Sequence, residues 1–221
     1  MNPIRRLLGR PLPPRVAIVQ AELDRFAGAR YLEIGVNTGV LFLHVRARRK
    51  IGVDPLPAVP AWKRALHPNT LRRGRLIEAT SDAYFASLRS EERFDVVFVD
   101  GDHAYRQSLR DIERALERLA PGGAVLVHDC SPESAGAASP DPGDAGGGAW
   151  CGDVWKAIAH LRATRAELHV ETLDIDFGIA VVRARQEGDR RAIELDPALI
   201  EKMGYADLEA NRAELLGLRG P

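Results

Sequence analysis

The chain has 221 residues, enough to bury one good core, and we expect a single domain over residues 1–221. Lys and Arg total 31, as do Asp and Glu, so the zero formal charge gives no reason to expect a nucleic acid or a membrane as partner. Two cysteines do not make a disulfide framework, and no run approaches the ~20 apolar residues of a membrane helix. These features predict a cytoplasmic protein, and the preference for Arg over Lys favours a bacterial one.

Alternating apolar strands and amphipathic helices fill most of the chain. After an irregular arm over 1–14, strands are expected at 30–34, 50–54, 76–79, 94–100, 124–128, 168–173 and 178–183. Helices are expected at 16–26, 38–46, 82–88, 105–119, 153–162, where Asp153 is the predicted N-cap, and 206–218. A Gly-rich loop over 131–149 is expected to be flexible, because its composition cannot pack a core. This order predicts an α/β fold, a Rossmann-like doubly wound sheet of seven mostly parallel strands with an antiparallel C-terminal hairpin.

The first predicted strand ends in an acid and leads directly into a Gly-x-x-x-Gly loop. Glu33 lies near the strand end, Gly35 and Gly39 bound the loop, and a second strand ends at Asp54. Glycine lets the backbone approach a ligand closely, and an acid after the second strand can bind two ribose hydroxyls. Because Asn37 occupies the second glycine position of the dinucleotide fingerprint, a nicotinamide-dependent oxidoreductase ranks well below other nucleoside-binding proteins.

The pattern Glu33-x-Gly35-x-x-x-Gly39 with Asp54 resembles the cofactor signature of class I S-adenosylmethionine-dependent methyltransferases. The resemblance implies that Glu33 lies close to the amino-acid end of S-adenosylmethionine, partly through water, and that Asp54 binds the ribose. The full set of expected cofactor-binding residues is Glu33, Gly35, Asn37, Thr38, Gly39, Asp54, Ser81, Asp82 and Asp100. Two ordinary interpretations stay open, a glycine turn of any doubly wound protein and a helix N-cap at Ser81 and Asp82.

Carboxylates recur at the predicted strand ends, at Glu33, Asp54, Asp100 and Asp129. In an open parallel sheet, ligands bind beyond the carboxyl ends of the strands, so these acids should lie along one rim. Asp102 and His103 follow in the loop after the fourth strand. A row of acids at one rim suits a cationic nucleoside better than a pyrophosphate.

The segment 94–105, FDVVFVDGDHAY, resembles small-molecule O-methyltransferases of the macrocin and cephalosporin-biosynthesis type and, more distantly, catechol O-methyltransferase. The likeness continues through Asp111 and the segments 119–123, 128–129 and 150–156. It implies methylation of a hydroxyl on a sugar or other natural product. It also implies that His103 and Asp100 are catalytic, with His103 as general base, and that Asp100 and Asp129 hold a divalent cation such as Mg²⁺ in metal-dependent members.

The chemistry agrees with these roles, although alternatives stay open. A base with a pKa near neutrality can take the proton of an alcohol as it attacks a methyl sulfonium. The neighbours of Asp129 are His128 and Cys130, not the second hard ligand of metal-dependent relatives, so the metal is an open question. Asp100 and Asp129 could instead cap turns, the protein could bind the cofactor without catalysis, and homo-oligomerisation is undecided.

Overall fold

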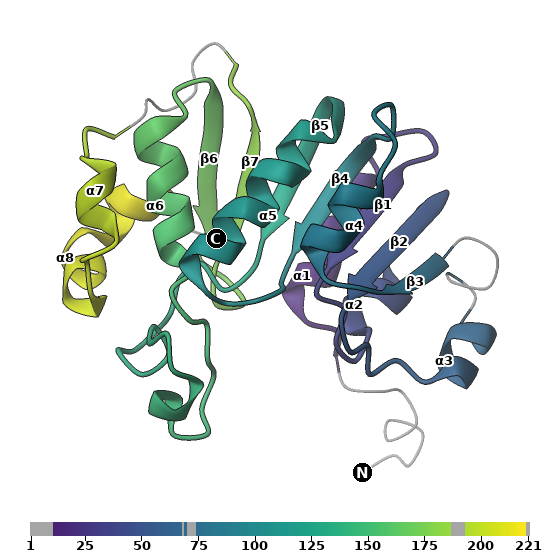
Figure 1. Cartoon of the computed structure of the whole chain (residues 1–221), viewed down its shortest axis with the longest axis horizontal. Helices are drawn as coiled ribbons and strands as arrows, with labels where there is room; N and C mark the ends of the chain where they lie inside the picture. Colours follow the sequence, from purple (N-terminus) through teal and green to yellow (C-terminus); the bar gives the residue numbers. More distant parts are fainter. Residues whose placement is uncertain (1–10, 68, 70–73, 187–192, 220–221) are drawn as a thin grey trace.

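The computed structural model describes residues 11–67, 69, 74–186 and 193–219, so most of the predicted N-terminal arm lies outside the described residues. Eight strands in this part of the chain form one sheet in the order β3-β2-β1-β4-β5-β7-β6-β8 (Figure 1). The strands are β1 (Arg30–Ile34), β2 (Arg49–Asp54), β3 (Gly74–Glu78), β4 (Phe94–Val99), β5 (Leu119–Val127), β6 (Leu168–Leu173), β7 (Ile179–Ala184) and β8 (Leu218–Arg219).

The first five strands run parallel, and β7 pairs antiparallel with both β5 and β6. This arrangement confirms the predicted α/β class, the doubly wound sheet and the antiparallel hairpin near its end. The short strand β8, parallel to β6, is an addition to the seven expected strands. Chain order reverses between β1 and β4, which is the switch point where doubly wound sheets bind ligands.

Helices cover both faces of the sheet (Figure 1). In the view shown, α4, α5 and α6 lie in front of the sheet, α1 and α2 lie behind it, and α7 and α8 lie beyond its β6 end. The helices are α1 (Pro14–Leu23), α2 (Val40–His44), α3 (Ala61–Leu66), α4 (Ser81–Ser87), α5 (Tyr105–Glu117), α6 (Trp155–Thr164), α7 (Pro197–Ile200) and α8 (Tyr205–Leu216). None of the helices in the described ranges is long and apolar enough to span a bilayer.

Strand alternation divides the core into two layers. Val97 and Val99 of β4 pack with helices α4, α5 and α6, whereas Val96 and Phe98 pack with α1 and α2. Successive side chains of a strand point to opposite faces, so a strand buried on both faces reads as a continuous apolar run. The same alternation decides which strand-end residues can reach a ligand.

Two local expectations need correction. The strand expected at 124–128 begins earlier, at Leu119, so that Pro121-Gly122-Gly123 lies inside the irregular first half of β5, whose pairing with β4 shifts register there. Asp153 was expected to cap the helix that follows it, but α6 begins at Trp155 without a side-chain cap. The Asp153 carboxylate instead accepts a hydrogen bond from the Tyr105 backbone N–H at 2.6 Å, at the start of α5. Tertiary contact with α5 therefore replaces the local cap.

Candidate active site

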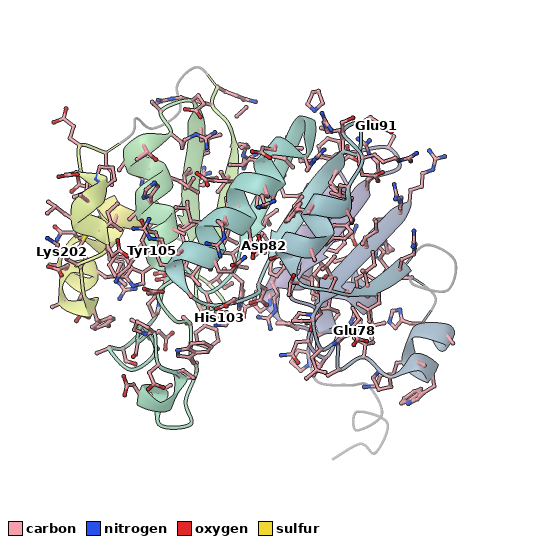
Figure 2. The ribbon with its side chains drawn as sticks, in the orientation of Figure 1. Glu78, Asp82, Glu91, His103, Tyr105 and Lys202 are labelled. Carbon is pink, nitrogen blue, oxygen red and sulfur yellow. The ribbon has the colours of Figure 1, made fainter. Side chains whose placement is uncertain are left out.

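A cavity of about 780 Å³ opens at the carboxyl ends of β1, β2 and β4. Its size lies within the usual range for small-molecule sites. Eight of the expected site residues line it: Gly35, Asn37, Asp54, Ser81, Asp82, Asp100, His103 and Asp129. Figure 2 shows His103 and Glu78, the last residue of β3, at the same lower edge of the sheet, with His103 beside the Gly-rich loop. The residues that line the cavity thus lie where the ends of β1, β2 and β4 meet.

The Gly35 backbone closes the gap between β1 and β4. Gly35 has φ +81°, and a Cβ placed on it would lie 1.8 Å from the Asp100 carbonyl oxygen, so no side chain fits there. Gly39 also has positive φ, but it begins α2 and packs against Val59 instead of lining the cavity. Thr38 is exposed and does not line the cavity either. Only the first half of the glycine loop faces the ligand space.

Asp54 holds the glycine loop in place. Its Oδ2 accepts the backbone N–H groups of Val36 at 2.9 Å and Asn37 at 2.7 Å, while its Oδ1 accepts that of Leu56 at 2.7 Å. A carboxylate offers about four acceptor positions, so one remains on Oδ1. Asp54 therefore lines the cavity as predicted, and it has room for one direct hydrogen bond, not the two expected from a ribose-binding acid.

Glu33 does not reach the cavity, contrary to its expected place beside the ligand. Its side chain points to the opposite face of the sheet, where Tyr31 Oη donates to its Oε2 at 2.7 Å. Burial raises the pKa of Glu33 to about 8. Its neighbour Ile34 lines the cavity instead. The physical reason is alternation along β1, which places Glu33 and Ile34 on opposite faces.

Residues of α4 and α5 meet at another wall of the cavity. Gln107 Nε2 donates to Ser81 Oγ at 3.3 Å and to Asp111 Oδ1 at 3.0 Å. The α4 N-cap is Thr80, which accepts the Ala83 N–H, so the open alternative of a cap at Ser81 is wrong. Ser81 and Gln107 are left as polar groups that could face a nucleobase.

Two carboxylates and two imidazoles form an ionic cluster at the ends of β4 and β5. His103 Nε2 lies 3.5 Å from Asp100 Oδ1 and 3.3 Å from Asp129 Oδ2. His128 Nδ1 lies 3.4 Å and 3.1 Å from the same two oxygens. The structure therefore joins the residues predicted to be catalytic with those predicted to bind metal. It also adds His128, which lies within the segment of family likeness at 128–129 but was given no catalytic role.

The short distances between these carboxylates and imidazoles shift the pKa values of Asp100 and His103. Burial opposes ionisation of Asp100, but hydrogen bonds from His103 and His128 outweigh it and hold the Asp100 pKa well below its usual range. Burial likewise disfavours a charged His103, yet the hydrogen bond with Asp100 and the charge of Asp129 raise its pKa overall. The contacts make His103 a group that readily holds a proton.

His128 lies between two carboxylates on one side and Arg15 on the other. Burial lowers the pKa of His128, while Asp100 and Asp129 raise it more. However, Arg15 Nη1 lies 2.9 Å from Nε2 of His128, and a guanidinium can only donate. A proton on Nε2 would point at Arg15, so this contact favours the proton on Nδ1, which lies 3.1 Å from Asp129 Oδ2.

The segment after the Gly-rich loop orients His103. His103 Nδ1 donates to the Trp150 carbonyl at 3.2 Å, and the two rings stack with centroids 4.9 Å apart. A Cβ on Gly152 would lie 2.1 Å from the His103 carbonyl oxygen, so glycine is required for this approach. Because Nδ1 is engaged, Nε2 is the nitrogen of His103 that faces Asp100 and Asp129.

The cluster has the donors of a metal site. One atom each from Asp100, His103 and Asp129 lie within 4.8 Å of one another. The Trp150 carbonyl fixes the His103 tautomer in the way that outer contacts orient imidazole ligands. Two carboxylates and one imidazole fit Mn²⁺, Fe²⁺ or Zn²⁺ at least as well as Mg²⁺, which favours oxygen ligands.

Comparisons with known proteins agree with this architecture. Residues 32–130 match a family model described as a methyltransferase domain. No curated protein matches the sequence. The fold resembles the S-adenosylhomocysteine-bound methyltransferase PaMTH1 of Podospora anserina, with 20% identity, a TM-score of 0.54 and 77% of each chain covered.

Two further solved structures share the fold. The O-methyltransferase from Bacillus cereus, in complex with S-adenosylhomocysteine, is 16% identical with a TM-score of 0.52, over 84% of this chain and 82% of that one. Cofactor-bound Rv0187 from MTB is 18% identical with a TM-score of 0.55, over 85% of this chain and 99% of that one. Residues 32–130 are therefore similar to a methyltransferase domain, and the fold of the chain is the one that these solved structures share.

Proposed function

We propose that this protein transfers the methyl group of S-adenosylmethionine to a hydroxyl of a small molecule. The observation that carries the proposal is the position of His103. Its Nε2 lies between Asp100 and Asp129 in the same cavity that Gly35 and Asp54 line. A proton acceptor next to a nucleoside-sized cavity is what alcohol methylation requires of a protein.

The residues present fit the cofactor. Gly35 and Asn37 line the cavity, Asp54 Oδ1 keeps one acceptor position for a ribose hydroxyl, and Ser81 and Gln107 offer polar groups to the base. The acids that line the cavity suit the cationic sulfonium. Glu33 has no direct part in this arrangement, because its carboxylate lies on the other face of the sheet.

When bound, S-adenosylmethionine supplies an electrophilic methyl group, so the protein has to orient the acceptor and remove its proton. His103 donates Nδ1–H to Trp150 and can accept the hydroxyl proton at Nε2. Asp100 and Asp129 then stabilise the imidazolium that forms. Hydrogen bonding and charge from these carboxylates make His103 a stronger base than a free imidazole.

A divalent cation, if used, would be held by Asp100, Asp129 and His103 Nε2, and it would lower the pKa of the acceptor hydroxyl. One nitrogen cannot bind a cation and accept a proton at the same time. Metal assistance and general-base catalysis by His103 are therefore alternative forms of the same proposal, and they predict opposite responses to a chelator.

The test measures formation of S-adenosylhomocysteine with a panel of hydroxylated sugars, phenols and natural products. His103→Gln should lower kcat by about 10²–10⁴-fold and leave S-adenosylhomocysteine affinity within a few-fold. His160→Gln is the matched control, because His160 also makes a side-chain hydrogen bond, to Tyr105, but does not line the cavity. Full activity of His103→Gln would show that His103 is not the general base.

Excess chelator decides between the two forms of the proposal. Unchanged activity in the chelator supports His103 as the base, whereas lost activity that returns with Mn²⁺ or Mg²⁺ supports the metal-assisted form. A protein that binds S-adenosylhomocysteine but methylates nothing in the panel would favour a non-catalytic binding role.

A further inference from the structure

The non-glycine residues with positive φ in the described part of the chain all lie in or next to one cavity. They are Asn37, Asp129, Asp176 and Phe177. Asn37, Asp129 and Phe177 line the cavity, and Asp176 contacts it through Arg15. For a bulky residue such as Phe177 a φ of +62° is a true outlier, and such strain clusters at ligand sites.

The strained turn between β6 and β7 lies outside the segment that matches the family model. The cofactor-facing residues Gly35, Asn37 and Asp54 all come from within that segment. The turn instead places Phe177 on the cavity wall and Asp176 against α1. The turn therefore forms a part of the cavity wall that is separate from the glycine loop after β1.

Asp176 fixes Arg15 of α1 in a set position. Asp176 Oδ1 accepts from Arg15 Nη1 at 2.7 Å, and Oδ2 accepts the Arg15 backbone N–H at 3.1 Å. The same Nη1 lies 2.9 Å from His128 Nε2. Among the described residues that line the cavity, Arg15 is the one Lys or Arg.

The geometry leaves part of the Arg15 guanidinium for a ligand. Its contacts with described side chains use Nη1, so the Nε and Nη2 donors remain for a ligand. The Arg15 side chain is 24% exposed, so it is accessible from the cavity it lines. A guanidinium edge held by one carboxylate can take a second one through paired hydrogen bonds.

We propose that Arg15 and Phe177 select an acceptor that combines an aromatic ring with an anionic group, so that the substrate class is a hydroxylated aromatic carboxylic acid. The assignment rests on the proposed function. The imidazole of His128 lies between Arg15 and Asp129, so these two groups are about one ring width apart. An acceptor whose carboxylate binds Arg15 and whose hydroxyl reacts near Asp129 therefore carries these two groups on opposite sides of its own aromatic ring. Phe177 and Trp150 supply the apolar walls for that ring.

A purely structural role for Arg15 predicts different behaviour, and Arg30 provides the comparison. Arg30 binds Asp95 in the same manner, with its backbone N–H and its guanidinium on one carboxylate at 2.7 Å and 2.8 Å. Arg30 does not line the cavity. Arg15 ties α1 to the turn between β6 and β7, whereas Arg30 of β1 binds Asp95 of the neighbouring strand β4, so only Arg15 can influence the choice of acceptor.

The experiment compares matched acids and amides as acceptors. The probes are 3,4-dihydroxybenzoate and 3-hydroxybenzoate with their corresponding amides, and the readout is kcat/KM for S-adenosylhomocysteine formation. The wild type should prefer the acids by about 10- to 100-fold, the factor expected for hydrogen bonds to a charged group. Arg15→Gln should bring the ratio close to one, Arg15→Lys should give an intermediate ratio, and Arg30→Gln should keep the wild-type ratio.

Three results would overturn the assignment. They are equal use of acid and amide by the wild type, equal loss of both in Arg15→Gln, and no turnover of any acid by a protein that binds S-adenosylhomocysteine. Failure of the wild type to bind S-adenosylhomocysteine would instead contradict the proposed function itself. The wild-type ratio decides the matter even if Arg15→Gln does not fold.

Discussion

Gly35 and Asp100 are in direct backbone contact across the switch point of the sheet. A Cβ at Gly35 would lie 1.8 Å from the Asp100 carbonyl oxygen. This contact joins the glycine loop after β1 to the acidic loop after β4, so the two halves of the candidate site depend on one glycine.

Gly35→Ala should destabilise the protein by about 2–4 kcal/mol, because it adds a steric clash to an unfavourable positive φ. It should also abolish S-adenosylhomocysteine binding, since the loops after β1 and β4 must separate. Gly122→Ala is the matched control, with φ +77° and no atom within 4 Å of the added Cβ. Urea unfolding and calorimetry measure the two effects. Equal behaviour of both variants would show that conformation alone, not contact with Asp100, requires glycine.

Asp54→Ala should weaken S-adenosylhomocysteine binding by about 1.5–3 kcal/mol, the loss expected for hydrogen bonds to a charged group. Because Asp54 also holds the N–H groups of Val36 and Asn37, the melting temperature should fall as well. Asp141→Ala removes a comparable turn-forming carboxylate outside the cavity and should leave affinity unchanged. Unaltered affinity in Asp54→Ala would mean that the ribose is held elsewhere.

Mn²⁺ binding can be measured without any acceptor. Electron paramagnetic resonance should detect one bound Mn²⁺ per chain if Asp100, His103 and Asp129 form a metal site, and Asp129→Asn should weaken binding at least tenfold. Asp102→Asn serves as control, because Asp102 also lines the cavity but instead bonds to the Ala104 N–H. Weak binding that is equal in all three proteins would argue against the metal-assisted form.

Glu33 should make stability depend on pH in a predictable direction. Burial raises its pKa from 4.5 to about 8 in the folded protein, so the folded state binds this proton more tightly than the unfolded chain. The stability contributed by protonated Glu33 is present below about pH 4.5 and is lost as pH rises toward about 8. Glu33→Gln, which keeps the neutral shape, should gain at least about 1.4 kcal/mol relative to wild type between pH 5 and pH 8.

Urea unfolding of both proteins across this range measures the Glu33 effect. The comparison between variant and wild type cancels the titration of groups that both share, including the histidines of the cavity. A difference that stays constant with pH would show that Glu33 is ionised in the folded protein at neutral pH.

The order and type of the main elements could be predicted because they depend on local pattern. The continuous apolar run of β4 and the amphipathic repeat of α5 specify a buried strand and a half-buried helix by themselves. The short elements α3, α7 and β8 were missed. A four-residue helix or a two-residue strand carries too little periodicity to be recognised, and its formation depends on neighbours.

Part of the candidate site could likewise be predicted from the sequence. Asp54, Asp100 and Asp129 each lie at or just after the end of a strand, and parallel strands bring their carboxyl ends to one edge, so their convergence follows from the pattern alone. Glu33 shows the limit of this reasoning. A strand end fixes the edge of the sheet, but whether a side chain faces the ligand depends on which face the alternation gives it.

The sequence by itself determined the fold class, the binding edge and the catalytic candidate His103, because each is encoded by residues close together in the chain. Only the tertiary structure placed Arg15, His128 and Phe177 around the same cavity, since they come from α1, the end of β5 and the turn between β6 and β7. Contacts between residues more than a hundred positions apart leave no periodic signal along a single chain. They arise when packing of the helices and closure of the sheet bring those segments together.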